Sequence, residues 1–199
     1  MNSLRRFQIV LSAALLLTIL SHRVSAHEGD PMGGFLSGFT HPIFGLDHVL
    51  AMVAVGLWGA QLGVPAVWLL PVAFPLVMAI GGFLGLIGVP IPGVEIGVAA
   101  SAVVLGAMVF RQARPKLPVA LLLVALFAIF HGYAHGTELP AGESGLLYSI
   151  GFVVGTGLLH GCGILLGAIH RWNWGKRCIQ GAGLLIAAGG CYFLFEALT

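Results

Sequence analysis

The sequence predicts an all-α fold, a polytopic membrane helix bundle with six transmembrane helices after a cleavable N-terminal signal peptide. The 199 residues are 58% hydrophobic and only 8% charged, and their mean hydropathy is +1.01, whereas soluble domains carry about 25% charged residues. Six apolar segments follow one another along the chain, each near the ~20 residues that a membrane-spanning helix needs. The lipid bilayer is therefore the expected surroundings of this chain.

The first 26 residues have the layout of a secretory signal peptide. Arg5-Arg6 forms a basic start, residues 7–20 form a short apolar core, and Val24-Ser25-Ala26 offers the small residues that signal peptidase requires. We expect cleavage after this tripeptide, which leaves residues 27–199 as a single transmembrane domain. An uncleaved first helix is the alternative.

Breaks that contain proline or charge separate the six expected spans, and residues 28–38 read as a polar, glycine-rich stretch before the first. We place the spans at residues 41–62, 66–88, 94–112, 117–137, 145–169 and 179–197. With the mature N-terminus outside, every lysine and arginine after the signal peptide falls on the cytoplasmic side, as the positive-inside rule asks. These residues are Arg111, Arg114, Lys116, Arg171, Lys176 and Arg177. Signal peptide and charge distribution thus predict the same orientation.

The first motif that carries ionisable groups is H-P-I-F-G-L-D-H, from His41 to His48, at the start of the first span. An ionisable group at bilayer depth costs roughly 2.5–3.5 kcal/mol on insertion scales, so such groups usually mark a pathway or a site. On one continuous helix the two histidines share a face, because seven steps of 100° fall about 20° short of two turns. Asp47 then lies at the flank of that face.

The second motif is F-H-G-Y-A-H-G-T-E, from Phe130 to Glu138, at the outer end of the fourth span. His131 and His135 are four residues apart and Glu138 follows three later, so all three line one helix face. The expected topology places this face at the same level as the first motif. Glycines flank the two histidines and would let a partner helix pack closely.

Together the two motifs offer imidazole nitrogens and carboxylate oxygens without a thiolate. Such mixed donors suit Ni²⁺, Co²⁺, Zn²⁺ or Cu²⁺; a purely structural polar network is the alternative. The three cysteines have no C-x-x-C spacing, so they signal neither a disulfide framework nor a cysteine zinc site. The candidate metal ligands are His41, Asp47, His48, His131, His135 and Glu138.

Two further histidines each allow two interpretations of their role. His160 lies deep in the fifth span, where it is either a later station on a path or a satisfied core histidine. His27 would start the mature chain, where its amino group and imidazole would hold a metal only weakly, or have no role at all. The sequence does not decide either case.

The motifs H-x5-D-H at residues 41–48 and F-H-G-x-A-H-G-x-E at residues 130–138, with the signal peptide and six spans, resemble the HupE/UreJ family of bacterial membrane proteins. This family is associated with hydrogenase and urease gene clusters and is regarded as secondary nickel or cobalt permeases. The resemblance covers essentially the whole chain. It implies functional roles for the six candidate ligands and a place in the bacterial inner membrane, with a periplasmic mature N-terminus.

The expected function is therefore a secondary permease that takes up nickel, or cobalt, for metalloenzyme maturation, with the maturation proteins as further partners. We expect no enzyme activity, no permanently bound cofactor and no nucleic-acid partner; monomer and homo-oligomer both remain compatible. No P-loop is present for ATP use. The alternatives are a non-transporting metal-binding accessory protein, a haem protein with His48 and His131 as axial ligands, and an intramembrane metalloprotease, although neither H-E-x-x-H nor G-x-S-x-G occurs.

Overall fold

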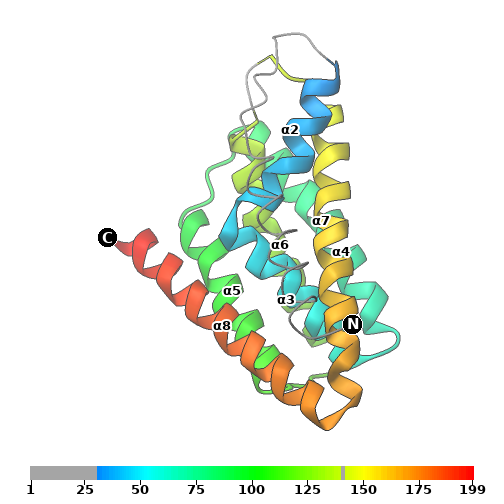
Figure 1. The fold of residues 1–199 in the computed structure, drawn as a ribbon. Helices are drawn as coiled ribbons and strands as arrows, with labels where there is room; N and C mark the ends of the chain where they lie inside the picture. Colours follow the sequence, from blue (N-terminus) through cyan, green and yellow to red (C-terminus); the bar gives the residue numbers. More distant parts are fainter. Residues whose placement is uncertain (1–30, 140–141) are drawn as a thin grey trace, which may run out of the picture.

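The computed structural model describes residues 31–139 and 142–199, and every regular element in these ranges is a helix (Figure 1). The elements are α2 (Pro31–Phe44), α3 (Leu46–Leu62), α4 (Ala66–Leu86), α5 (Val94–Phe110), α6 (Leu117–Thr137), α7 (Gly145–Gly167), the short 3₁₀ helix η1 (Ala168–Arg171) and α8 (Asn173–Leu198). The predicted all-α class is confirmed for this part of the chain. The signal peptide predicted at residues 1–26 lies outside the described residues, as does His27.

Each of the six predicted spans corresponds to an apolar helical segment. By length and composition α4, α6, α7 with η1, and α8 can each cross a membrane, and the bent pair α2–α3 adds a fifth span if the pair counts as one. The apolar helix α5 has only 17 residues and is too short to be counted among these candidate spans. The structure thus supports a membrane protein with four or five candidate spans, and six spans remain a prediction.

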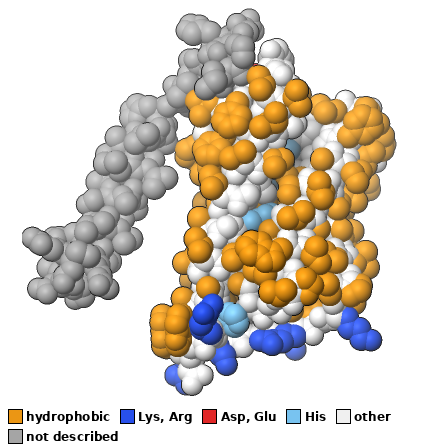
Figure 2. Space-filling view, turned by 90° about the vertical axis from the view of Figure 1, so that its right-hand side faces the viewer, with side chains coloured by type: hydrophobic (Ala, Val, Ile, Leu, Met, Phe, Trp, Pro, Cys, Tyr) orange, Lys and Arg blue, Asp and Glu red, His pale blue; other side chains and the backbone are white. Residues whose placement is uncertain are grey.

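The helix α3 forms the centre of the bundle, where it packs against α4, α5, α7 and α8. Around it, α4 packs against α6, α5 against α8, and α2 against α7. Almost the whole of α3 from Ala51 to Gln61 is buried. At its far end the Trp58 indole donates a hydrogen bond to the Ala113 carbonyl (2.9 Å), and the Gln61 amide donates one to Val109 (3.1 Å). Apolar side chains cover the sides of the bundle, as expected for contact with lipid (Figure 2).

Residues 31–38 of the polar, glycine-rich stretch expected before the first span belong to helix α2, which starts at Pro31. The glycines serve packing between α2 and α7. A Cβ atom at Gly38 would collide with the backbone of Tyr148, and one at Gly151 would collide with the Phe35 carbonyl. Small residues at these positions let the two backbones approach closely.

The expectation of one continuous helix over residues 41–62 is wrong. The axes of α2 and α3 differ by 79° across Gly45, which has an extended conformation (φ −82°, ψ 103°). A first-turn backbone N–H of α3, that of His48, is satisfied by the Asp47 carboxylate at 2.9 Å. His41 and His48 therefore belong to two different helices.

The described lysine and arginine side chains gather at one end of the bundle (Figure 2). They lie in the α5–α6 connection, in η1 and at the start of α8. Glu138 and Glu143 flank the α6–α7 connection, which lies at the opposite end (Figure 1). This separation is the one that the positive-inside rule describes, so the end with Glu138 is called the outer end below.

Candidate metal centre

Four histidine rings from three helices meet towards the outer end of the bundle. They are His41 at the end of α2, His48 in the first turns of α3, and His131 and His135 on α6, and we call them the histidine cluster. The ring centroid of His48 lies 4.8 Å from that of His131 and 4.3 Å from that of His135, and the centroids of His41 and His135 are 4.8 Å apart. Two motifs that are more than 80 residues apart in the sequence thus form one site.

The donor atoms of the site fall into two groups of three that share one member. His41, His135 and Glu138 form an outer triad, and His48, His131 and His135 form an inner triad; within each triad the donor atoms lie within 4.8 Å of one another. In the outer triad Oε2 of Glu138 is 3.2 Å from Nε2 of His41 and 3.7 Å from Nδ1 of His135. The hydrogen bond with His41 lowers the pKa of Glu138 below its ordinary value, against the opposing effect of partial burial.

The two triads differ in their access to solvent. The side chain of Glu138 is 53% exposed and that of His41 is 33% exposed, whereas that of His135 is only 6% exposed. In the inner triad His48 is buried and His131 has no exposed surface. An ion that enters from the outer end therefore meets the outer triad first.

The orientation of His48 is fixed by its neighbour in the sequence. Oδ1 of Asp47 lies 2.8 Å from Nδ1 of His48, and because a carboxylate can only accept, the ring donates from Nδ1. The neutral ring then presents a free electron pair on Nε2, which is buried and has no partner among the described residues. Asp47 was predicted as a ligand, but it lies in neither triad. It instead contacts and orients the ligand His48.

A serine that the sequence analysis did not single out orients His131 in the same way. The hydroxyl of Ser101, on α5, donates a hydrogen bond to the Val98 carbonyl at 2.5 Å and so accepts one from Nε2 of His131 at 2.8 Å. This leaves Nδ1 of His131 as the free nitrogen, buried and unpartnered in the part of the chain that the structure describes. An isolated hydroxyl inside an apolar helix was the available signal, because buried polar groups seek partners on neighbouring helices.

Close packing between α6 and α4 sets how α6 is rotated. A Cβ atom at Gly132 would collide with the Met78 carbonyl, and one at Gly136 would collide with the Gly82 carbonyl. The predicted role of these glycines in close helix packing is confirmed, and the partner helix is α4. With this face of α6 against α4, His131 and His135 both contact His48 on α3, and His135 also contacts Phe152 on α7.

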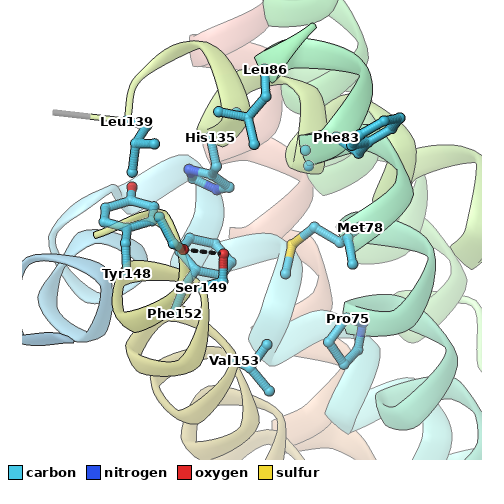
Figure 3. Close-up of a pocket in the computed structure, with 15 residues that line it drawn as sticks. Pro75, Met78, Phe83, Leu86, His135, Leu139, Tyr148, Ser149, Phe152 and Val153 are labelled. Atoms are coloured by element: carbon cyan, nitrogen blue, oxygen red, sulfur yellow. Dashed lines mark hydrogen bonds between the residues drawn. The ribbon is translucent and has the colours of Figure 1, made fainter. Parts of the chain in front are cut away.

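A cavity of about 170 Å³ lies between α4, α6 and α7 and reaches His135 (Figure 3). Its walls are mostly apolar, and they include Met78, Phe83, Leu86, Leu139, Phe152 and Val153. The hydroxyl of Ser149, which also lines the cavity, is bound to the Gly145 carbonyl of its own helix at 2.7 Å. His135 is thus the nitrogen donor that the cavity offers.

The chemistry of the site suits a transition-metal ion. Buried nitrogens without a partner cost about 1–3 kcal/mol each, and His48, His131 and His135 each have at least one such nitrogen. Neutral imidazoles with one carboxylate are ligands for Ni²⁺, Co²⁺, Zn²⁺ or Cu²⁺. Haem fits less well, because the rings of His48 and His131 touch edge to face at 4.8 Å and 89° and leave no space for a porphyrin between them.

Comparisons with known proteins agree with the motifs. A family model described as "HupE / UreJ protein" matches residues 15–193. The chain is also similar to a protein of Rhizobium leguminosarum bv. viciae described as "Protein HupE", with 42% identity over 182 residues that cover 92% of this chain and 94% of the relative. No solved structure matches.

Proposed function

This chain belongs to the HupE/UreJ family, and from this premise we propose that it is a secondary permease for divalent transition-metal ions. The family is associated with nickel and cobalt uptake for hydrogenase and urease, and it is a transport and accessory family, not a catalytic one. In this proposal the chain lies in the bacterial inner membrane with its mature N-terminus in the periplasm. It carries Ni²⁺, or Co²⁺, inward for metalloenzyme maturation.

The observation that carries the proposal is the pair of adjoining triads, with unpartnered ring nitrogens on the three histidines of the inner one. Asp47 leaves Nε2 of His48 free, and Ser101 leaves Nδ1 of His131 free. Outer partners of this kind fix the tautomer and the ring orientation of metal-binding histidines. A structural polar network would be expected to pair these nitrogens with donors, yet they remain unpaired among the described residues.

The shared residue His135 connects the two triads in a way that favours movement of the ion. A neutral imidazole has one free electron pair, so His135 completes only one triad at a time. An ion bound by His41, His135 and Glu138 passes to His48 and His131 when the ring of His135 follows it. The number of ligands per ion stays small, and weak binding of this kind allows release.

The break between α2 and α3 supports the same function. Transporters commonly build ion sites where a membrane helix is interrupted, because the ends of the half-helices carry partial charges. The carboxyl-terminal end of α2 is the negative end of its dipole, and His41 lies in its last turn. The 79° bend thus brings a cation-attracting helix end to the histidine cluster.

The driving force in this proposal is the membrane potential. A divalent ion that crosses towards a negative interior gains about 4.6 kcal/mol per 100 mV, which is twice the value for one charge. No nucleotide-binding motif is needed for uptake. The inner triad is neutral apart from the Asp47 carboxylate behind His48, so it adds little electrostatic trapping to oppose release.

The test is uptake of Ni²⁺ and Co²⁺ by the purified full chain in liposomes, with and without an imposed inside-negative voltage. We expect voltage-dependent uptake by the wild type, and its loss in His48→Ala and His131→Ala at unchanged protein content. His170→Ala is the control, because that ring lies at the opposite end, where Nδ1 is 2.9 Å from the Gly167 carbonyl. Binding without transport by the wild type would favour the accessory role, and normal uptake by both cluster variants would refute the site.

A further inference from the structure

A second polar group lies deeper in the bundle than the histidine cluster. On α7 the residues Tyr148, Phe152, Thr156 and His160 recur every four positions and are all buried, so they form one stripe that faces the interior. Phe152 contacts the cluster, with its ring centroid 4.1 Å from that of His135. His160 follows two helical turns later, about 12 Å further along the axis.

The polar atoms at the deep end of this stripe lack partners. Both ring nitrogens of His160 and the hydroxyl oxygen of Thr156 are buried without a hydrogen bond in the described part of the chain, and the two residues are 1% and 0% exposed. These unpaired atoms favour the later station over the satisfied core histidine, the two interpretations that the sequence left open. Buried polar groups that stay unpaired call for an explanation such as a ligand.

A backbone oxygen lies at the same place. The ring of His160 is close to the carbonyl of Pro71 on α4, although it makes no hydrogen bond of good geometry there. This carbonyl has no partner within its own helix, because its partner four residues later would be the N–H of Pro75, and proline has none. His160, Thr156 and Pro71 thus bring one nitrogen and two oxygen atoms to one region between α4 and α7.

The ring of Phe74 separates this region from the cluster. Its centroid is 5.5 Å from that of His131 on one side and 5.5 Å from that of His160 on the other. Phe74 is fully buried. An ion that leaves the inner triad in the direction of the cytoplasmic end therefore has to pass this ring before it reaches the next nitrogen.

We propose that His160, with the Thr156 hydroxyl and the Pro71 carbonyl, is an inner binding station for the divalent transition-metal ion, and that Phe74 separates it from the outer cluster. The proposal rests on the permease function proposed above. A partly dehydrated ion in an apolar core has a high energy, and a nitrogen donor there lowers the barrier to crossing. Neither α4 nor α7 contains a charged residue, and α3 has only Asp47, at its outer end, so the station holds the ion weakly enough to release it.

The first test compares uptake by His160→Gln with that by the wild type in liposomes, with His170→Gln as the matched control. A ligand contributes at least as much as the partners that orient it, so we expect the maximal rate to fall by about 10–100-fold. The half-saturating concentration and equilibrium binding at the outer cluster should stay unchanged, since no cluster residue is altered. A normal maximal rate in His160→Gln, with a transporting wild type, would overturn the station and leave the permease function intact. A wild type that binds but does not transport would instead overturn the permease function.

The second test detects ion binding at the inner station directly and does not depend on transport. In a background with Cys162, Cys178 and Cys191 replaced by serine, His160→Cys should give a thiolate-to-cobalt charge-transfer band when Co²⁺ is added. Cysteine thiolates bind such ions, and the three native cysteines are exposed on the outside of the bundle. His170→Cys should give no band. Co²⁺ binding at the cluster without a band in His160→Cys would overturn the proposal, and the retained cluster binding would show that this variant is folded.

Discussion

The hydroxyl of Ser101 accepts a hydrogen bond from Nε2 of His131 at 2.8 Å, although 30 positions separate the two residues in the sequence. The same hydroxyl donates to the Val98 carbonyl, so the direction of the bond to the histidine is fixed. Together with the contact between Asp47 and His48, this pair decides which ring nitrogen His48 and His131 each offer. Whether the inner triad presents lone pairs to an ion therefore depends on Asp47 and Ser101, which both lie outside it.

Ser101→Ala should weaken ion binding without unfolding the protein. Loss of an outer partner of a metal-binding histidine typically costs about 10–100-fold in affinity or activity, because the ring can then rotate or change tautomer. The measurement is the half-saturating Ni²⁺ concentration for uptake in liposomes. Ser149→Ala is the control, since that hydroxyl is bound within its own helix, and an unchanged half-saturating concentration in Ser101→Ala would contradict the assigned role.

Asp47→Asn and Asp47→Ala should differ in a graded way. Asparagine keeps an oxygen that accepts from Nδ1 of His48 and from its backbone N–H, whereas alanine removes both contacts. We expect uptake in the order wild type, Asp47→Asn, Asp47→Ala, with alanine losing about 10–100-fold in apparent affinity. If Asp47 were itself a ligand, both variants should lose uptake to the same extent as His48→Ala.

Gly132→Ala should destabilise the bundle because its Cβ atom meets the backbone carbonyl of Met78, which cannot move away without shifting α4. Forced overpacking of this kind costs typically about 1–3 kcal/mol. Gly161→Ala on α7 is the matched control, because nothing lies within 4 Å of a Cβ atom there. Thermal unfolding of the purified proteins in detergent should show a lower midpoint for Gly132→Ala only, and equal midpoints would contradict the packing argument.

Uptake should fall on acidification because imidazoles bind metal only in their neutral form. Histidine is the side chain that typically changes its charge between about pH 5 and 8, so the measurement covers outer pH values in this range. The pKa of Glu138 lies below its ordinary value of 4.5. Its carboxylate therefore stays charged throughout this range and loses its charge only at lower pH. Uptake measured against outer pH should therefore still show an acid limb in Glu138→Gln, at a lower rate than in the wild type; loss of the acid limb in the variant would assign the titration to Glu138.

The sequence predicted the positions of the six apolar helical segments and the residues that meet at the histidine cluster, because hydrophobic runs and ionisable groups in them are local signals. It predicted α6 at residues 117–137, where the structure has it. It missed the helical part of the glycine-rich stretch before His41, since the stability of α2 comes from contact with α7, which is 100 residues away. The last span begins earlier than predicted, at Asn173, because Lys176 and Arg177 are good helix formers and continue the helix into the polar region.

The site itself was predicted on an incorrect geometric premise. His41 and His48 would share a face only on a continuous helix, whereas the chain bends by 79° between them. They still come together, with centroids 6.4 Å apart, because the bend turns the end of α2 back over the start of α3. Ser101 and the contact of Phe74 with two histidines required coordinates, because both depend on how neighbouring helices are rotated.

The position of His135 in both triads has a consequence for inhibition. An ion that dissociates slowly from one triad keeps the other incomplete, and no second ion can follow it. Cu²⁺ binds nitrogen donors more tightly than Ni²⁺ or Co²⁺, so it should block the uptake of both at concentrations at which it is hardly carried itself. The proposed permease would then discriminate between ions by their residence time, so that the most tightly bound cation inhibits uptake and a moderately bound one is transported.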